Sequence, residues 1–327
     1  MAEVIPIQGR GEEERPDRCR AVTASGRPCR NRASGPDGLC GVHRGRDRVI
    51  GADPLRETLA FLRRRFTGEY EVDEFGFDRE LTETALAPLA RFFHERWWRT
   101  DWIGIENVPS EGPAVLVSNH AGTLPWDAVM LKFGVLDRHP ARRHVRLLAA
   151  DLAFRLPFIG ELARKSGNTL ATGEDAYRLL AAGEVLGVFP EGFKGVGKPF
   201  AQRYKLQRFG RGGFIEVALR ARCPIVPVSI VGSEEIMPML YNAKTLARIF
   251  GFPYFPVTPT FPWLGPLGLI PIPSKWTIEF GEPIATDDQA EDAWQDPLTV
   301  FELTDRVRDE IQQTLNRNLL HRRSVFL

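Results

Sequence analysis

The segment from Pro113 to Leu131 constrains the fold of this chain more than any other stretch. It opens with the apolar run Ala114 to Val117, whose length and β-branched content are typical of a fully buried strand. The run stops at Ser118-Asn119-His120, so a histidine lies at the carboxyl end of the expected strand. Pro125 then marks the first turn of a helix, where its missing N–H needs no partner. Buried strands that alternate with helices predict an α/β fold.

Asp127 falls in the first turn of that helix, where the helix dipole favours an ionised carboxylate. Such a group can hold the Nδ1–H of a nearby imidazole and leave Nε2 free as a base. His120 and Asp127 are therefore the candidate general base and its orienting acid. The chain has no G-x-S-x-G motif, which favours direct attack by a substrate hydroxyl that the histidine deprotonates. The alternative is that the two residues only cap a strand and a helix.

Two more motifs follow at the ends of apolar runs. Phe189 to Gly192 (FPEG) closes the run Val185 to Val188, and Pro224 to Val228 (PIVPV) opens another. In this order and spacing, Asn119-His120 with the following aspartate, FPEG and PIVPV resemble the lysophospholipid acyltransferase family, which includes lysophosphatidic-acid acyltransferases. The resemblance covers residues 80 to 290.

This resemblance implies an α/β domain with a mixed, largely parallel central sheet flanked by helices. It implies transfer of a fatty acyl chain from a thioester carrier, acyl-CoA or acyl carrier protein, to a lipid hydroxyl, with no metal in the chemistry. The residues that match the family's general base and orienting acid are His120 and Asp127. The candidate substrate-binding residues include two cations of the basic stretch that follows FPEG. They are Asn119, Gly122, Glu191, Gly192, Lys194 and Arg211.

The chain departs from the family pattern around both the acid and the acceptor site. The gap between histidine and aspartate is six residues instead of four, as in a less studied branch of the family. The family's threonine and phosphate-gripping arginine after Glu-Gly are replaced by Phe193 and Lys194, and the strand that ends at Thr172 lacks a second such arginine. The acceptor therefore stays open between lysophosphatidic acid and a neutral alcohol such as diacylglycerol. A non-catalytic lipid-binding or carrier-binding protein is the competing hypothesis.

Three further stretches each allow two or more interpretations. The cations from Lys194 to Arg211 form either an anion site for carrier phosphates or a lipid headgroup, or a solvated loop. The helix expected over residues 80 to 99 lies in a membrane interface or faces the core. The proline-punctuated apolar stretch from Phe252 to Pro273 inserts into a bilayer, roofs an acyl tunnel, or packs back on the protein.

The first 50 residues are arginine-dense and poor in large apolar side chains, so they cannot bury a core unaided. They contain Cys19, Cys29, Cys40 and His43, a set of ligands that can complete a tetrahedral shell around zinc. Metal binding would supply the missing folding energy. The alternatives are a disordered tail with incidental thiols, or disulfides, which would leave one of these cysteines unpaired. The partner of this module is open.

These observations predict five regions: residues 1–18 disordered, 19–43 a zinc module, 44–79 a linker with a short helix, 80–290 the acyltransferase domain, and 291–327 a C-terminal helix packed on it. Lysine and arginine number 43 against 42 acidic residues, so overall charge indicates no nucleic-acid partner. The chain lacks an apolar run of about 18 residues, and its N-terminus does not resemble a signal peptide. We expect a cytoplasmic protein at the inner face of a membrane.

Overall fold

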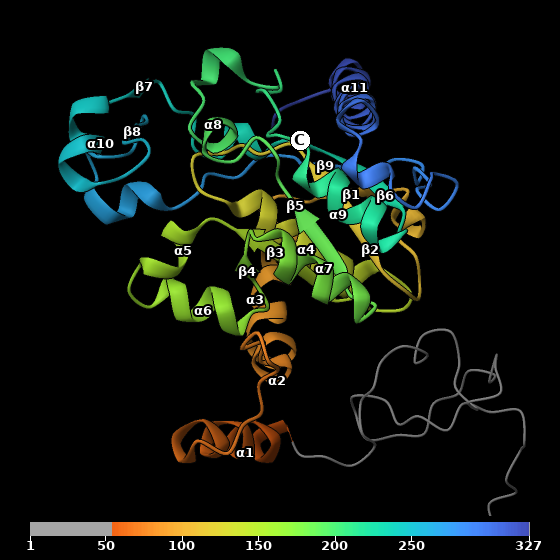
Figure 1. The fold of residues 1–327 in the computed structure, drawn as a ribbon. Coiled ribbons are helices and arrows are strands. Elements are labelled where there is room, and N and C mark those ends of the chain that lie inside the picture. The colour runs from red at the N-terminus through yellow and green to blue at the C-terminus, as the bar shows by residue number, and fades with distance from the viewer. Residues whose placement is uncertain (1–53, 327) are drawn as a thin grey trace, which may run out of the picture. The chain divides into compact units, whose positions relative to one another are not determined.

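The computed structural model describes residues 54 to 326. The chain divides into two units, Met1–Glu69 and Tyr70–Leu327. The described part of the first unit contains helix α1 (Pro54–Thr67), at the position where the sequence predicts a short helix (Figure 1). The predicted zinc module, residues 19 to 43, lies outside the described residues.

A seven-stranded sheet forms the centre of the second unit, with the strand order β1-β9-β6-β2-β5-β3-β4 (Figure 1). Strands β6 and β9 pair antiparallel, and the other neighbours pair parallel. This confirms the predicted mixed, largely parallel α/β fold. The strands are β1 (Asp101–Ile103), β2 (Ala114–Ser118), β3 (Val145–Ala149), β4 (Thr169–Leu170), β5 (Val185–Val188), β6 (Ile225–Val231) and β9 (Thr277–Phe280), and a separate pair is formed by β7 (Tyr241–Asn242) and β8 (Pro256–Val257).

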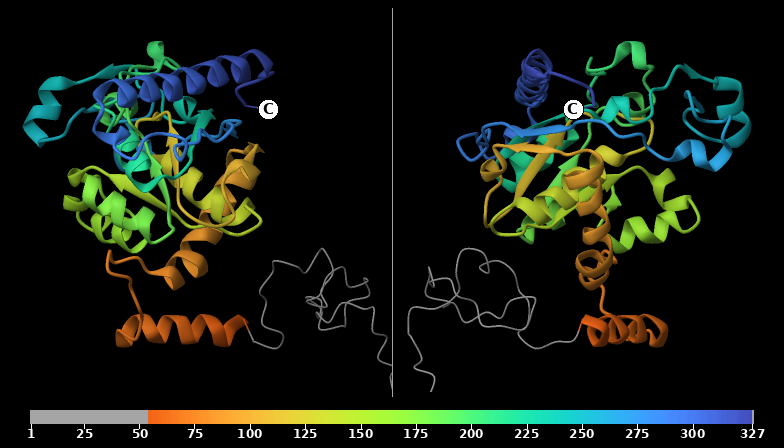
Figure 2. Two further views of the ribbon diagram at one scale, coloured as in Figure 1. Left: turned by 45° about the vertical axis from the view of Figure 1, so that its right-hand side comes forward. Right: turned by 180° about the vertical axis from the view of Figure 1, so that it is seen from behind.

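Helices cover both faces of this sheet, as Figure 2 shows. Val115 and Val117 of β2 pack into one core, and Ala114 and Leu116 pack into the other, because successive residues of a strand point to opposite faces. Burial on both faces explains why β2 reads as a continuous apolar run. The helices of the first core are α7 (Gly173–Ala181), α9 (Gly213–Ala221) and α11 (Pro297–His321), and those of the second are α3 (Ala87–Phe92) and α4 (Trp126–Arg138).

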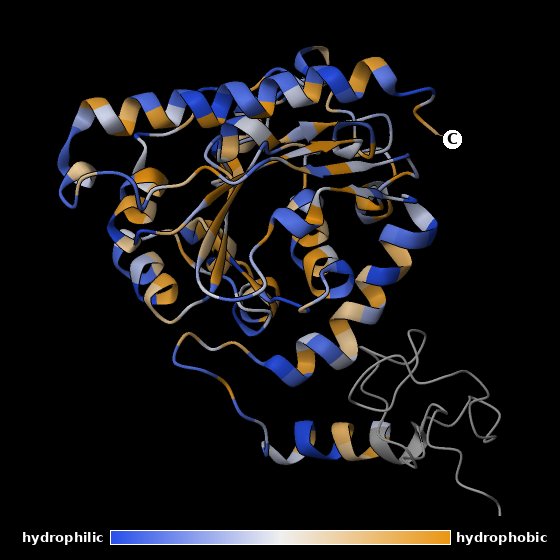
Figure 3. Cartoon of the chain, turned by 90° about the vertical axis from the view of Figure 1, so that its right-hand side faces the viewer, coloured by the Kyte–Doolittle hydropathy of each residue, from blue (hydrophilic) through white to orange (hydrophobic). Residues whose placement is uncertain are grey.

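Helix α11 shows how its sequence pattern fixes its packing. Leu303, Val307, Ile311 and Leu315 recur at helical spacing and are buried in the first core. Figure 3 shows apolar and polar residues alternating along this helix. Asp296 caps its N-terminus by accepting hydrogen bonds from the N–H groups of the first turn.

The helix expected over residues 80 to 99 is interrupted twice by π-helical turns. It consists of α2 (Arg79–Leu81), a π-turn, α3 and a second π-turn that ends at Trp97. A π-turn adds a residue to the turn and rotates the side chains that follow it. Leu89 and Phe92 are therefore 59% and 49% exposed, whereas Ala87 and Ala90 face the core. The core-facing interpretation therefore does not hold for these two side chains, and the membrane-interface interpretation stays a prediction.

Short helices connect the strands near their carboxyl ends. They are α5 (Asp151–Arg155), α6 (Ile159–Lys165), α8 (Phe193–Val196) and α10 (Lys244–Phe250). In Figure 1 and in the view from behind in Figure 2, α5 and α6 lie on the same side of the molecule as α10. Among residues 54 to 326, no helix has both the length and the apolar character that crossing a bilayer requires.

Candidate active site

The chain after β2 is held by the side chain of Asn119. Its amide donates to the carbonyl of Ile230 at 3.0 Å and accepts the N–H of the same residue at 2.8 Å. Asn119 thus continues the ladder between β2 and β6 with its side chain and frees the backbone to turn. This turn places His120 at the carboxyl edge of the sheet, where open α/β sheets bind their ligands.

The imidazole of His120 meets the carboxylate of Asp127 directly. Nδ1 of His120 lies 2.8 Å from Oδ2 of Asp127, which is fully buried. The same Oδ2 accepts the N–H of Ala121 at 2.7 Å, and Oδ1 accepts that of Ala128 at 2.8 Å. The carboxylate is therefore fixed from both sides. With Nδ1–H donated to Asp127, Nε2 carries the free lone pair.

Two residues with positive φ explain how six residues fit between histidine and aspartate. Gly122 has φ of 94° and Thr123 has φ of 67°. A Cβ at Gly122 would lie 2.5 Å from the carbonyl oxygen of Ser233, so this position requires glycine. The hydroxyl of Thr123 donates to the carbonyl of Met237 at 2.8 Å. The longer spacing is thus accommodated by a tight loop, and Asp127 still reaches the imidazole.

Glu191 lies beneath the histidine and supports the loops around it. Its Oε1 accepts the backbone N–H of His120 at 2.8 Å, and its Oε2 accepts that of Gln207 at 2.6 Å. The side chain is fully buried. The sequence places Glu191 among the acceptor-binding residues. In the structure its carboxylate joins the histidine turn to the loop at Gln207, because both of its oxygens already accept backbone hydrogen bonds.

A buried ionic network extends from Glu191. The ammonium of Lys198 lies 3.8 Å from Oε2 of Glu191 and 3.0 Å from Oε1 of Glu234. Burial, with a smaller contribution from the neighbouring Glu191, raises the pKa of Glu234 to about 7, and burial also raises the pKa of Glu191. Lys198 therefore does not belong to a solvated basic loop: it is an internal cation shared by two carboxylates.

A cavity of about 900 Å³ opens beside His120. This volume is at the upper end of the range for small-molecule sites, roughly 300–1,000 Å³. It crosses the carboxyl edge of the sheet and has apolar walls on both faces. The walls include Leu86, Leu89, Phe93, Val129 and Phe133 from the α3 and α4 side, and Ala176, Phe214 and Val217 from the α7 and α9 side.

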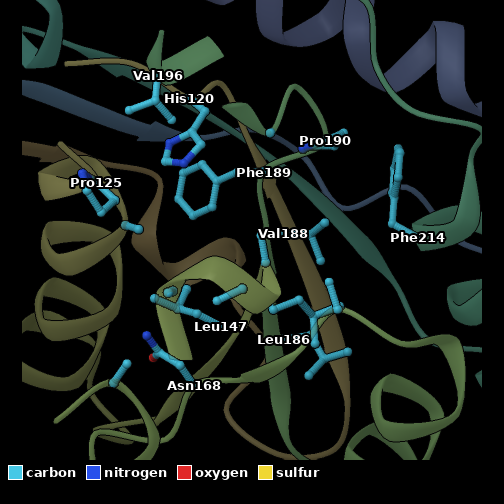
Figure 4. A pocket seen from close by; sticks show the side chains of 18 of the residues that line it. His120, Pro125, Leu147, Asn168, Leu186, Val188, Phe189, Pro190, Val196 and Phe214 are labelled. Atoms are coloured by element: carbon cyan, nitrogen blue, oxygen red, sulfur yellow. The ribbon is translucent and has the colours of Figure 1, made fainter. Parts of the chain in front are cut away.

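Figure 4 shows how the site residues lie in this cavity. The imidazole of His120 lies beside the ring of Phe189, with the ring centroids 4.5 Å apart, and Leu147 and Asn168 lie further along the wall. Of the candidate substrate-binding residues, Gly192 and Arg211 line the cavity. The cavity wall in the described chain does not include Asn119, Gly122, Glu191 or Lys194.

Some residues of the site were not singled out from the sequence. Phe189 packs on the histidine, and its place in the FPEG motif is the signal that marks it. Tyr254 lines the cavity and donates to the carbonyl of Thr123, thereby tying the apolar stretch after Phe252 to the histidine loop. Burial raises the pKa of the Tyr254 hydroxyl. The pairing of Lys198 with Glu234 depends on a contact between distant segments, for which the sequence holds no signal.

Comparison with known proteins identifies the family. Residues 99 to 231 match the model of an acyltransferase family. Uncharacterised proteins of Mycobacterium tuberculosis and Mycobacterium leprae are 59% identical over 275 residues, which cover 84% of this chain and 77% and 75% of those proteins. A chicken protein described as a DGAT1/2-independent enzyme synthesizing storage lipids is 26% identical over 227 residues, covering 69% of this chain and 62% of its own length.

A solved structure shares the fold. The 1-acyl-sn-glycerophosphate acyltransferase PlsC of Thermotoga maritima superposes with a TM-score of 0.50 at 18% sequence identity, covering 83% of this chain and 97% of that one. The family match places this chain among the acyltransferases. The chain belongs to the acyltransferase family and has the α/β fold of a glycerolipid acyltransferase.

Proposed function

We propose that this protein is an O-acyltransferase that moves a fatty acyl chain from a thioester donor to the hydroxyl of a lipid acceptor. The observation that carries the proposal is the pairing of His120 with Asp127 at the edge of a large apolar cavity. Hydrocarbon chains bind in such a cavity through the hydrophobic effect. The imidazole is the base that a hydroxyl nucleophile needs.

The proposed reaction is a single acyl transfer. The acceptor hydroxyl gives its proton to Nε2 of His120 while its oxygen attacks the thioester carbonyl. The carbon–sulfur bond breaks, an ester bond forms, and the imidazolium returns the proton to the leaving thiolate. Asp127 holds the ring through Nδ1 and stabilises its transient positive charge, as the acid of a catalytic triad does.

The acceptor that we favour is a neutral lipid alcohol, such as a partial glyceride. Both arginines that grip the acceptor phosphate in the family are replaced in this sequence. Among the described residues, the arginine, lysine, aspartate and glutamate side chains that line the cavity are Arg211 and Glu216, and their opposite charges offset each other. The similarity to a protein described as synthesizing storage lipids supports the same class.

The purified full-length chain tests this proposal when it is incubated with a long-chain acyl thioester and an equimolar mixture of diacylglycerol, monoacylglycerol and lysophosphatidic acid. Mass spectrometry of the products should show acylated neutral glycerides in excess. If lysophosphatidic acid alone is acylated, the protein is an acyltransferase but the proposed neutral acceptor is wrong. Lipid binding without turnover from any thioester would support the competing hypothesis of a non-catalytic binding protein.

We also propose that the protein associates peripherally with a membrane through an apolar rim at the cavity mouth. We assign to this rim the exposed side chains Phe158, Ile159, Leu162 and Phe193, and those of Trp263, Leu264 and Leu267 in the apolar stretch after Phe252, whose Tyr254 lines the cavity. Ile159, Leu162 and Phe193 also line the cavity. Soluble proteins seldom leave such a surface in water, and tryptophan prefers the membrane interface. A hydrocarbon substrate could then enter the cavity directly from the bilayer.

We expect the double variant Trp263→Ser, Leu267→Ser to bind vesicles of phosphatidylcholine and phosphatidylglycerol at least about tenfold more weakly, because each apolar side chain contributes roughly 1.5–3 kcal/mol when buried. The wild-type side chains are 73% and 68% exposed. The matched control is Leu298→Ser, Leu320→Ser on α11, whose side chains are 63% and 85% exposed. Equal flotation of the two double variants with the vesicles would contradict the rim.

We propose a structural zinc ion for the segment with Cys19, Cys29, Cys40 and His43, because these ligands have the number and chemistry of a tetrahedral site. We expect one zinc per chain in purified full-length protein by elemental analysis. The double variant Cys40→Ser, His43→Ala should lose it. Zinc content that this variant leaves unchanged would contradict the proposed ligand set.

A further inference from the structure

A second cavity of about 500 Å³ lies between the loop Arg208–Gly212 and the segment that leads into α11. Its chemistry differs from that of the apolar cavity. The guanidinium groups of Arg208, Arg211 and Arg308 line it, together with the aromatic side chains of Trp294 and Phe301. Three cations and two aromatic rings are the groups that proteins use to bind phosphates and to stack bases.

The two cavities share part of their walls. Gly210, Arg211, Gly212 and Glu216 line both of them. The shared loop is held against the active site by a hydrogen bond from the N–H of Gly210 to the carbonyl of Pro190, at 3.2 Å. The loop with Arg211 therefore lies between the two cavities, and a ligand that reaches from His120 to the second cavity would pass along this loop.

The loop is also fixed on its other side. A Cβ added at Gly212 would lie 2.5 Å from Cγ1 of Val300, so only glycine allows the loop to approach α11 this closely. The backbone of Gly212 has φ of 82°, which also favours glycine. Both walls of the second cavity are thus held in place by packing.

The arginines of this cavity are available to a ligand. Arg208 and Arg211 are exposed and form no ion pair or hydrogen bond within the described part of the chain. Arg308 lies 3.5 Å from Asp309, and that carboxylate is itself 64% exposed. Exposed pairs of this kind contribute little to stability, so they do not compete strongly with a phosphate. The first N–H groups of the nine-residue helix α9 lie beside Arg211 and add to an anion site.

The other lining groups fit the remaining parts of a nucleotide. Trp294 is 36% exposed and Phe301 is 61% exposed, and each can present a face on which a base stacks. The carboxylates of Glu216 and Asp305 line the same cavity and can accept hydrogen bonds from ribose hydroxyls or an exocyclic amine. With three guanidinium groups against two carboxylates, the cavity keeps an excess of positive charge.

We propose that the second cavity binds the phosphorylated nucleotide of coenzyme A, so that acyl-CoA is the donor of this enzyme. The inference rests on the proposed acyl transfer and names its donor. The acyl chain lies in the apolar cavity with its thioester at His120, and the pantetheine arm passes Arg211. An acyl carrier protein presents the same arm without a nucleotide, and it would leave the two aromatic rings without a partner.

The first test compares two donors that share the acyl group and the thioester. Palmitoyl-CoA carries the nucleotide, and palmitoyl-pantetheine lacks it. We expect the ratio of kcat/KM for the two donors to fall at least about tenfold in Arg308→Gln, because charge-assisted hydrogen bonds to phosphate are lost. The matched control is Arg306→Gln, an exposed arginine on the same helix outside the cavity. Its ratio should equal that of the wild type.

The second test removes a stacking ring without changing charge. Phe301→Ala should bind adenosine 3′,5′-bisphosphate more weakly than wild type by calorimetry, whereas Leu298→Ala should not. Leu298 is 63% exposed, close to the 61% of Phe301, and lies outside the cavity. Both positions are exposed, so we expect both variants to fold, which thermal melts will verify.

The outcomes separate this inference from the proposed function. Nucleotide binding without acyl transfer from any thioester would support the nucleotide site in the second cavity and contradict the proposed acyltransferase activity. Acyl transfer with no detectable binding of adenosine 3′,5′-bisphosphate, and with donor ratios unchanged in Arg308→Gln, would overturn the coenzyme A site. Faster transfer from acyl carrier protein than from palmitoyl-CoA would overturn it as well.

Discussion

Replacing His120 with alanine is expected to lower kcat for acyl transfer by about 10²–10⁴-fold, the usual contribution of a positioned general base. The acceptor hydroxyl then has to attack the thioester without a group that takes its proton. No other group in the proposed reaction takes the proton of the acceptor hydroxyl, so a higher acceptor concentration should not restore the rate. The measurement is steady-state turnover of an acyl thioester with the purified protein.

The fold should survive this substitution, because the His120 side chain lies at the cavity and is 12% exposed. Thermal melts verify this, and His321→Ala, an exposed histidine at the end of α11, is the control. In Asp127→Asn the carboxylate that holds Nδ1–H is lost, so the ring adopts the wrong tautomer or orientation and kcat should fall as well. Full turnover in folded His120→Ala protein would refute the proposed dyad.

Replacing Lys198 with methionine is expected to lower the free energy of unfolding by about 3–5 kcal/mol, the cost of removing one partner from a buried ion pair. Lys198 is the ammonium that Glu191 and Glu234 share, and all three side chains are buried. Without it, two carboxylates face each other in a region with little solvent. The measurement is urea unfolding, with Lys194→Met, an exposed lysine of the neighbouring helix α8, as the control.

The loss should depend on pH in a defined direction. The pKa of Glu234 is about 7 in the folded chain, above its ordinary value of 4.5, so the folded state binds the extra proton. The contribution of Glu234 to the stability of the wild type therefore falls as pH rises from about 4.5 to about 7. Removal of Lys198 raises the pKa of Glu234 further, so the difference in stability between wild type and variant grows as the pH rises through about 7, where Glu234 ionises in the folded wild type. A difference that stays constant as the pH rises through about 7 would contradict the ionic coupling of Lys198 to Glu234.

Local patterns in the sequence determined the elements and the positions of the proposed catalytic pair. The apolar run before Ser118 folds as β2, and the stripe of Leu303 and Val307 folds as the buried face of α11. These features depend on residues a few positions apart, and strand and helix periods suffice to find them. The pairing of His120 with Asp127 also spans a short loop, which kept it within reach of sequence reasoning.

Tertiary structure decided what each polar residue touches. Glu191 lies in the motif as a candidate for substrate binding, yet the fold directs its carboxylate to the backbone of His120 and Gln207. Lys198 belongs to a basic run, yet it is buried against Glu234. The second cavity exists because the loop at Arg211 packs on α11, a segment remote in sequence. Such contacts follow from which surfaces the sheet brings together, and no local pattern of residues encodes that arrangement.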